Sequence, residues 1–182
     1  MSINRLFGGR EPKLEAAVRT RMNGGELRSF FQGIAAEHAL DDLQFVCIGT
    51  DRSSGDALGP LTGSRLQAYG INAVTGTLSD PCDAETLLAK MRELPEGKIR
   101  IAVDACLGAE SSVGFYLVAQ APLMPAESVG LRLPPIGDYS IAAVVNRKSP
   151  KPYHTLQTTS LHLVMQMADE IAAAAAAAFG RI

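Results

Sequence analysis

One stretch, residues 45–60, constrains the fold more than any other part of the chain. It reads FVCIGTDRSSGDALGP, in which an apolar run with high β-propensity passes into a polar segment punctuated by glycine, and a helical pattern follows from Leu58. This order predicts a strand, a loop and a helix. In an open α/β sheet, ligands bind beyond the carboxyl ends of the strands, so this loop lies where a functional site is expected.

The same order of elements recurs further along the chain. The expected elements are a helix at 57–69, a strand at 71–75, a loop at 76–82, a helix at 83–94, a strand at 99–103 that Asp104 ends, and a loop of small residues at 105–112. Strands joined by helices of about a dozen residues imply right-handed crossovers and a mostly parallel sheet. The sequence therefore predicts an α/β protein, a three-layer α/β/α sandwich with a mostly parallel central sheet.

The flanking parts of the chain give weaker patterns. We expect helical structure at 11–40 with a break at Asn23-Gly24-Gly25, strands at 114–120, 128–133 and 139–145, and one long helix at 155–179. A chain of 182 residues is long enough for one sizeable core. The predicted organisation is an N-terminal helical extension at 1–40 followed by an α/β domain at 41–182, within one compact domain.

Charge and hydropathy narrow the class of partner. The net charge is −2, no basic run or stripe is present, and no apolar run of about 18 residues could cross a bilayer. We therefore expect a cytoplasmic protein that has neither nucleic acid nor a membrane as its partner. Cys47, Cys82 and Cys106 are odd in number and widely spaced, which indicates reduced thiols. Cys47 should be buried in its strand, and the other two should be more exposed on loops.

The glycines of the first loop do not predict a nucleotide site. Gly49, Gly55 and Gly59 lack the spacing of the dinucleotide fingerprint, and no Gly-Lys-Ser/Thr sequence closes a phosphate-binding loop. What remains is the general affinity of a helix N-terminus for anions.

Two aspartates are more informative. Asp56 and Asp104 each follow a strand expected near the centre of the sheet, so both should emerge at the same edge. Two close carboxyl groups cannot both ionise easily, so one can hold a proton while the other acts as a base toward water, or the two can bind a metal together. The alternative is that Asp56 caps a helix, as Ser54 also could, and that Asp104 forms a turn. The residues expected to contact substrate in this cleft are Thr50, Asp51, Arg52, Ser54, Thr77 and Asp80.

The histidines add one candidate to this edge. His38, His154 and His162 form no pair at helical zinc spacing, and His38 and His162 are expected at the surface or its boundary. His154 precedes the last helix and could reach the aspartates as a third metal ligand. A nucleophilic site would need Ser53, Ser54, Cys82 or Cys106, but no nucleophile elbow surrounds any of them.

Several motifs resemble the spore protease family of the YyaC type. They are CIGTDRSSGDALGP at 47–60, GTLSDP at 76–81, GDYSI at 137–141, VN at 145–146, LQTTSL at 156–161 and VMQMAD at 164–169. The resemblance spans residues 43–171 in the order of the family. That family is similar to the germination protease of spores and to the endopeptidases that mature nickel-iron hydrogenases, which implies the α/β/α sandwich fold.

The resemblance also implies roles for particular residues. The acidic metal ligands of the hydrogenase-maturation group correspond to Asp56, before Ala57-Leu58-Gly59, and to Asp104, before Ala105. The third ligand of that group, a histidine, falls on Leu156, and His154 lies two residues earlier. The family tends to have Asn and Arg within residues 157–160, where this chain has QTTS. Germination protease depends on aspartates without a required metal.

Three hypotheses follow. The first is an endopeptidase associated with sporulation, in which Asp56 and Asp104 activate water against a protein or peptide substrate without a cofactor. The second is a peptidase dependent on a divalent metal held by Asp56, Asp104 and His154. The third is a non-catalytic regulatory or binding protein on a peptidase fold.

Overall fold

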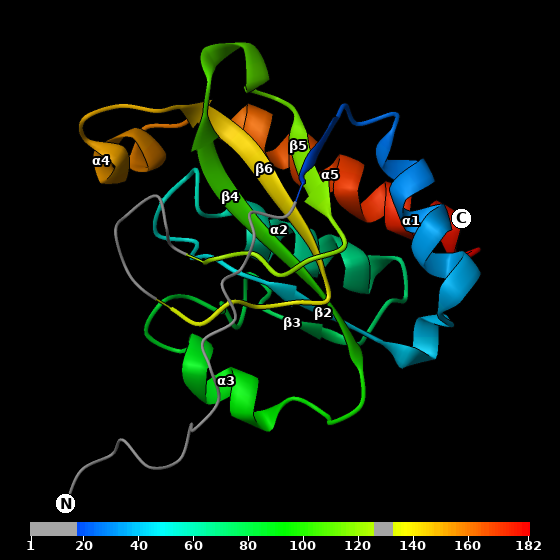
Figure 1. Cartoon of the computed structure of the whole chain (residues 1–182). Helices are drawn as coiled ribbons and strands as arrows, with labels where there is room; N and C mark the ends of the chain where they lie inside the picture. The colour runs from blue at the N-terminus through cyan, green and yellow to red at the C-terminus, as the bar shows by residue number, and fades with distance from the viewer. Residues whose placement is uncertain (1–17, 126–132) are drawn as a thin grey trace, which may run out of the picture.

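The computed structural model describes residues 18–125 and 133–182, and it shows a mixed six-stranded sheet with helices on both sides (Figure 1). The strands are β1 Thr20–Met22, β2 Leu43–Cys47, β3 Val74–Thr75, β4 Ile99–Gly108, β5 Tyr116–Ala119 and β6 Tyr139–Arg147, in the spatial order β1-β5-β6-β4-β2-β3. Strands β3, β2, β4 and β6 are parallel, whereas β5 is antiparallel to both β6 and β1. The predicted α/β class and mostly parallel sheet are confirmed.

Helices cover the two faces unequally. The helices are α1 Leu27–Glu37, α2 Leu58–Ala68, α3 Leu87–Glu93, α4 Pro152–Gln157 and α5 Leu161–Ala178, with short 3₁₀ turns at Leu40–Asp42 and Glu110–Ser112. Helices α1, α2 and α5 enclose the larger core with the odd-numbered residues of β4, including Ile101 and Val103. On the opposite face, a smaller core joins Ala102 to Leu87 of α3 and to Leu123 and Ile136.

The N-terminal segment departs from the predicted helix. Residues Thr20–Met22 form an edge strand that pairs with Tyr116–Val118 of β5. Pairing with an available sheet edge outweighs a weak helical period in so short a segment. Helix α1 then buries Leu27, Phe31 and Ile34 in the larger core. The predicted helix at 11–17 and most of the predicted strand at 128–133 lie outside the described residues.

Two further boundaries were predicted wrongly. Strand β4 does not end at residue 103 but continues to Gly108, paired with β6, so residues 104–108 are strand rather than loop. The predicted helix at 155–179 is two helices, interrupted at residues 158–160. The Thr158 and Thr159 hydroxyls donate to carbonyl oxygens of α4, and the Ser160 hydroxyl accepts from Leu163 N to begin α5.

The described residues include no helix with both the length and the apolar character needed to cross a membrane. Cys47 is buried, as predicted, and Cys106 is partly exposed. Cys82 is also buried, contrary to prediction, because it forms a parallel bridge with Ile48 and packs in the smaller core.

Candidate functional site

The loop after β2 folds back on itself over the end of that strand. Gly49 has a φ of 144°, and a Cβ atom at this position would lie 2.0 Å from the Asp56 carbonyl oxygen. Thr50 N donates a hydrogen bond of 3.1 Å to the same oxygen. Only glycine fits this approach of two backbone segments. The glycine therefore closes the loop, and no phosphate cradle is needed to explain it.

Four of the predicted substrate-binding residues are engaged within the loops. Arg52 forms an ion pair of 3.1 Å with Asp83, and its Nε donates to the Thr50 hydroxyl. The buried Thr77 hydroxyl accepts from Asp80 N, and the Asp80 carboxylate pairs with Lys90. These contacts tie the loops after β2 and β3 together. Asp51 is exposed to solvent.

Ser54 and Asp56 do not cap helix α2, contrary to the prediction. The Ser54 hydroxyl instead lies within hydrogen-bonding distance of the carbonyl oxygens of Leu156, Gln157 and Thr159, at 3.4, 3.0 and 2.8 Å. Gly55 N also donates to the Leu156 carbonyl. The loop is thus anchored to the break between α4 and α5.

Asp56 is half-buried in this loop. Burial raises the pKa of the Asp56 carboxyl above its usual range, and the nearby Ser53 hydroxyl offsets part of that rise. The Ser53 oxygen is buried and makes no hydrogen bond of normal geometry with the described residues. A carboxyl with a raised pKa is suited to holding a proton.

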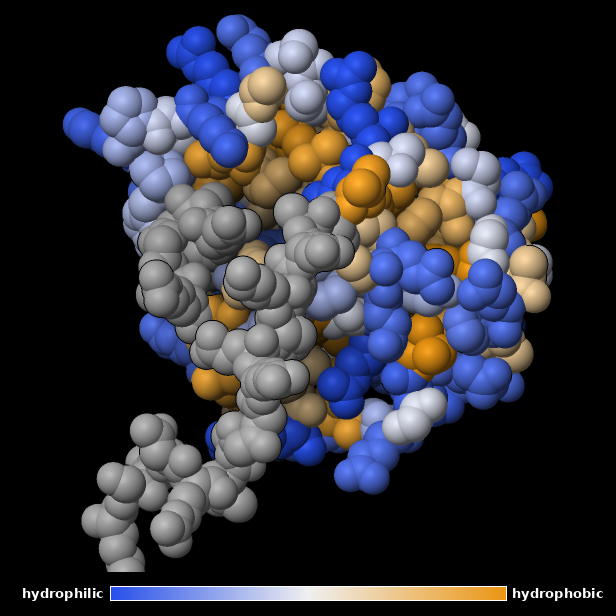
Figure 2. Space-filling view, in the orientation of Figure 1, coloured by the Kyte–Doolittle hydropathy of each residue, from blue (hydrophilic) through white to orange (hydrophobic). Residues whose placement is uncertain are grey.

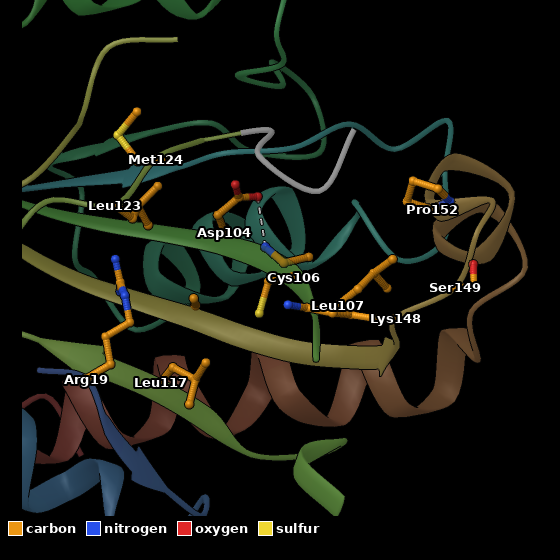
Figure 3. A pocket seen from close by; sticks show the side chains of 12 residues that line it. Arg19, Asp104, Cys106, Leu107, Leu117, Leu123, Met124, Lys148, Ser149 and Pro152 are labelled. Carbon is orange, nitrogen blue, oxygen red and sulfur yellow. Dashed lines mark hydrogen bonds between the residues drawn. The ribbon is translucent and has the colours of Figure 1, made fainter. Parts of the chain in front are cut away.

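Asp104 lies on the opposite face of the sheet from α1, α2 and α5, where it lines a cavity of about 530 Å³. Figure 3 shows Asp104 and Cys106 rising from β4, with Leu123 and Met124 beside Asp104 and with Ser149 and Pro152 at the far end. The described residues that line the cavity are Arg19, Asp104, Ala105, Cys106, Leu107, Leu117, Leu123, Met124, Ala142, Lys148, Ser149 and Pro152. Figure 2 shows apolar surface gathered over strands β4, β5 and β6 on this face.

Asp104 is the one predicted site residue among the described lining of this cavity. Its carboxylate accepts a hydrogen bond of 2.8 Å from Ala105 N. The loop that carries Asp56 leaves β2 directly beside it, because Ile48 N donates to the Val103 carbonyl. Asp56 itself does not line the cavity. The backbone segments that carry Asp56 and Asp104 therefore lie side by side at the carboxyl-terminal ends of the parallel strands. Of the two aspartates, Asp104 lines the cavity.

The three-ligand metal set does not assemble. His154 is exposed on α4. The buried Leu156 occupies the position that corresponds, by the resemblance, to the third ligand of the hydrogenase-maturation endopeptidases. Over residues 18–125 and 133–182, no group of three or more His, Cys, Asp or Glu side chains is arranged to hold a metal ion. The donor set thus does not fit a metal centre of that kind.

Several cavity residues were missed from the sequence: Arg19, Lys148 and Ser149, and Cys106 as a cavity residue rather than a loop residue. The alternation of residues 101–107, with Asp104 and Cys106 on one face, was the available signal for the longer strand. Arg19 had no such signal, because its partner Ser140 is 121 residues away in the sequence.

The sequence of the chain is similar to a known protein family and to a bacterial protein. The profile of the family described as "Protein of unknown function (DUF1256)" matches residues 18–174, beginning well before the motifs at 43–171. The uncharacterized protein YyaC of Bacillus subtilis (strain 168) is 45% identical over 132 residues, 70% of this chain and 64% of the relative. The chain therefore spans less than two thirds of that relative's length.

A solved structure shares the fold. The [NiFe] hydrogenase maturation protease HycI from Thermococcus kodakarensis KOD1 matches with a TM-score of 0.51 and 20% identity, over 76% of this chain and 92% of that protein. At this identity the likeness shows the α/β fold, and the activity of HycI remains a property of HycI.

Proposed function

This chain belongs to the DUF1256 family, and we propose that it is an endopeptidase whose Asp104 carboxylate activates water in the cavity on β4. Its substrate is a protein or peptide rather than nucleic acid or a membrane. The resemblance to spore proteases supports a role in sporulation, within the cytoplasm. The peptidase-like fold shared with HycI supports the reaction class by analogy.

The observation that carries the proposal is the position of Asp104. A carboxylate in the carboxyl-terminal half of a central strand opens into a cavity of about 530 Å³, whose described lining combines apolar residues with two cationic side chains. A concave site in which a few charged groups converge beside apolar side chains is a usual form of a substrate pocket.

The proposed reaction needs a group that takes a proton from water and a group that gives a proton to the leaving amine. The Asp104 carboxylate takes a proton from water as the water oxygen attacks the peptide carbonyl carbon, and the same carboxyl then gives that proton to the amine as the C–N bond breaks. Asp56, the second carboxyl of the predicted pair, has a raised pKa that favours its protonated form, but it lies outside the cavity lining, so we assign both proton transfers to Asp104.

A cleavage assay tests this assignment. The purified chain would be incubated with a peptide library prepared from a bacterial proteome, and new peptide ends would be identified by mass spectrometry. We expect wild-type protein to cleave a restricted set of bonds, with Asp104→Asn reducing cleavage by at least about 100-fold, the usual contribution of a general base. Asp42→Asn, on an exposed 3₁₀ turn, is the control that should cleave normally.

The outcomes separate the three hypotheses. Undiminished cleavage by a folded Asp104→Asn variant would overturn the proposal. Peptide binding without any cleavage would favour the non-catalytic protein. Activity that is lost with a chelator and restored by one divalent metal would favour the metal-dependent peptidase.

A further inference from the structure

We propose that Arg19 selects substrates by binding a carboxylate of the peptide that occupies the Asp104 cavity. The inference rests on the proposed function for the identity of the occupant as a peptide. It adds a specificity-determining residue and a chemical class, an acidic peptide, to that site.

The Arg19 guanidinium is held in place by two neutral acceptors. Its Nη1 donates to the Ser140 hydroxyl and its Nη2 to the Pro122 carbonyl oxygen, each at 3.2 Å. Ser140 is fully buried in β6, so one of these anchors is part of the sheet itself. The side chain therefore reaches from the start of edge strand β1 across β5 to the sheet centre.

These contacts leave much of the guanidinium available. It carries five N–H donors, and hydrogen bonds to described residues engage two of them, while none of the ion pairs between described residues involves Arg19. These two acceptors are neutral, so within residues 18–125 and 133–182 the hydrogen bonds of Arg19 do not neutralise its charge. A planar guanidinium fixed at the wall of a cavity is the group best suited to bind a carboxylate through two parallel hydrogen bonds.

The register of the sheet sets the distance between this anchor and Asp104. Asp104 pairs with Ala142, and Ser140 lies two residues before Ala142 on the same face of β6. One strand across and two residues along give a separation of about 8 Å between the two backbone positions. An extended peptide advances about 3.3 Å per residue, so the carboxylate would lie about two to three residues from the bond facing Asp104.

The rest of the cavity agrees with an acidic peptide. Leu117 near Arg19, and Leu123 and Met124 near Asp104, supply apolar wall, and Lys148 adds a second positive charge toward the other end (Figure 3). Two cations in the cavity favour a ligand with negative charge, beyond the single carboxylate of Asp104. Charge complementarity thus points to an anionic ligand with apolar neighbours.

Binding measurements with the Asp104→Asn chain test the inference without requiring cleavage. The probes are fluorescent, C-amidated hexapeptide pools of alanine and leucine that carry one aspartate or glutamate, and matched pools with asparagine or glutamine instead. A third pool has no acidic side chain but a free C-terminal carboxylate. We expect the acidic pools to bind about tenfold or more tightly than the amide pools, as for a hydrogen-bonded charge.

Variants at Arg19 and Arg21 locate the preference. Arg19→Gln should abolish the difference between acidic and amide pools. Arg19→Lys should retain part of it. Arg21→Gln is the matched control, because Arg21 lies only two residues further, on β1, but stacks over Phe115 and donates to the Ser111 carbonyl, outside the cavity. It should keep the full preference.

Each result bears on one proposal or the other. Tight binding of the free C-terminal pool alone would assign the carboxylate to the end of the substrate and would still support Arg19. Equal binding of acidic and amide pools, no binding of any pool, or a preference that survives Arg19→Gln would overturn the inference. If the wild-type chain cleaved peptides without an acidic preference, the peptidase proposal would stand and the role of Arg19 would be refuted. If peptides bound in an Arg19-dependent way but were not cleaved, the role of Arg19 would stand and the peptidase proposal would be refuted.

Discussion

The Ser54 hydroxyl donates to the Thr159 carbonyl oxygen at 2.8 Å, across 105 residues of sequence. This bond joins the loop after β2, which carries Asp56, to the break between α4 and α5. Gly55 N reinforces the junction through the Leu156 carbonyl. The loop at the sheet edge therefore takes its observed position only when the C-terminal helices have packed.

Ser54→Ala should destabilise the fold by about 1–2 kcal/mol, because the carbonyl oxygens of the helix break lose their shared donor. The change should be measured as the free energy of unfolding in urea. Ser29→Ala is the control, since its hydroxyl bonds only to the nearby Glu26 carbonyl on an exposed turn, and it should cost less. Equal losses for the two variants would contradict the anchoring role of Ser54.

Asp56 and Asp83 should affect the pH dependence of stability with opposite signs. Burial raises the pKa of Asp56 in the folded chain, so its stabilising contribution is present at low pH and is lost as pH rises through the folded-state pKa. Asp56→Asn should therefore be more stable than wild type at neutral pH, with the difference vanishing below about pH 3.9, the usual carboxyl pKa.

For Asp83 the sign reverses. Burial opposes ionisation of Asp83, but hydrogen bonds from Thr86 and Glu85 and the charge of Arg52 outweigh it and lower the pKa. Its contribution is present above the usual carboxyl pKa and is lost as pH falls. Asp83→Asn should be less stable than wild type at neutral pH and should approach it in acid. Thermal unfolding across the pH range checks both variants, and shifts of the same sign would refute the assignment.

Much of the parallel part of the sheet was predictable, because the sequence patterns that indicate its strands and helices are local. The apolar run at Phe45–Cys47, the glycines that follow and the helical period from Leu58 lie within one short stretch. The same holds for Asp104, because it directly follows the apolar residues 101–103 in the sequence, and it lines the cavity.

What escaped prediction depends on distant partners. The edge strand β1 exists because β5 offers it hydrogen bonds, and Arg19 reaches the cavity because Ser140 and Pro122 hold it there. The break at residues 158–160 was partly predictable from the sequence. The hydroxyls of consecutive Thr-Thr-Ser residues compete for the backbone hydrogen bonds of a helix, and Ser is a preferred N-cap.

Gly59 and Gly33 should respond to alanine in opposite ways. A Cβ at Gly59 would lie 2.0 Å from the Ile48 carbonyl oxygen, so α2 would have to move away from β2. Gly59→Ala should cost at least about 1–3 kcal/mol, the usual penalty of overpacking. Gly33 lies in α1 with no atom within 4 Å of its added Cβ, and Gly33→Ala should gain about 0.5–1 kcal/mol from helix propensity. The free energy of unfolding of both variants in denaturant would check these values. A Gly59→Ala variant as stable as wild type would contradict the close packing of α2 against the end of β2.

Cys106 should be the cysteine through which the cavity can be probed chemically. Cys47 and Cys82 are buried, and burial raises the pKa of the Cys82 thiol to about 11, so at pH 8 only about one molecule in a thousand holds its thiolate, the form that reacts. Cys106 is partly exposed within the cavity lining.

Brief iodoacetamide treatment of the native chain should therefore give one adduct, at Cys106, whereas treatment of the unfolded chain should give three. Mass spectrometry of peptide digests would locate the adducts, and Cys106→Ser should abolish the native one. Because Cys106 lies on the same strand face as Asp104, a peptide bound in the cavity should slow its alkylation, and the bulky adduct should in turn weaken peptide binding. Earlier labelling of Cys82 would contradict its burial, and labelling of Cys106 that a saturating peptide leaves unchanged would show that the peptide binds elsewhere.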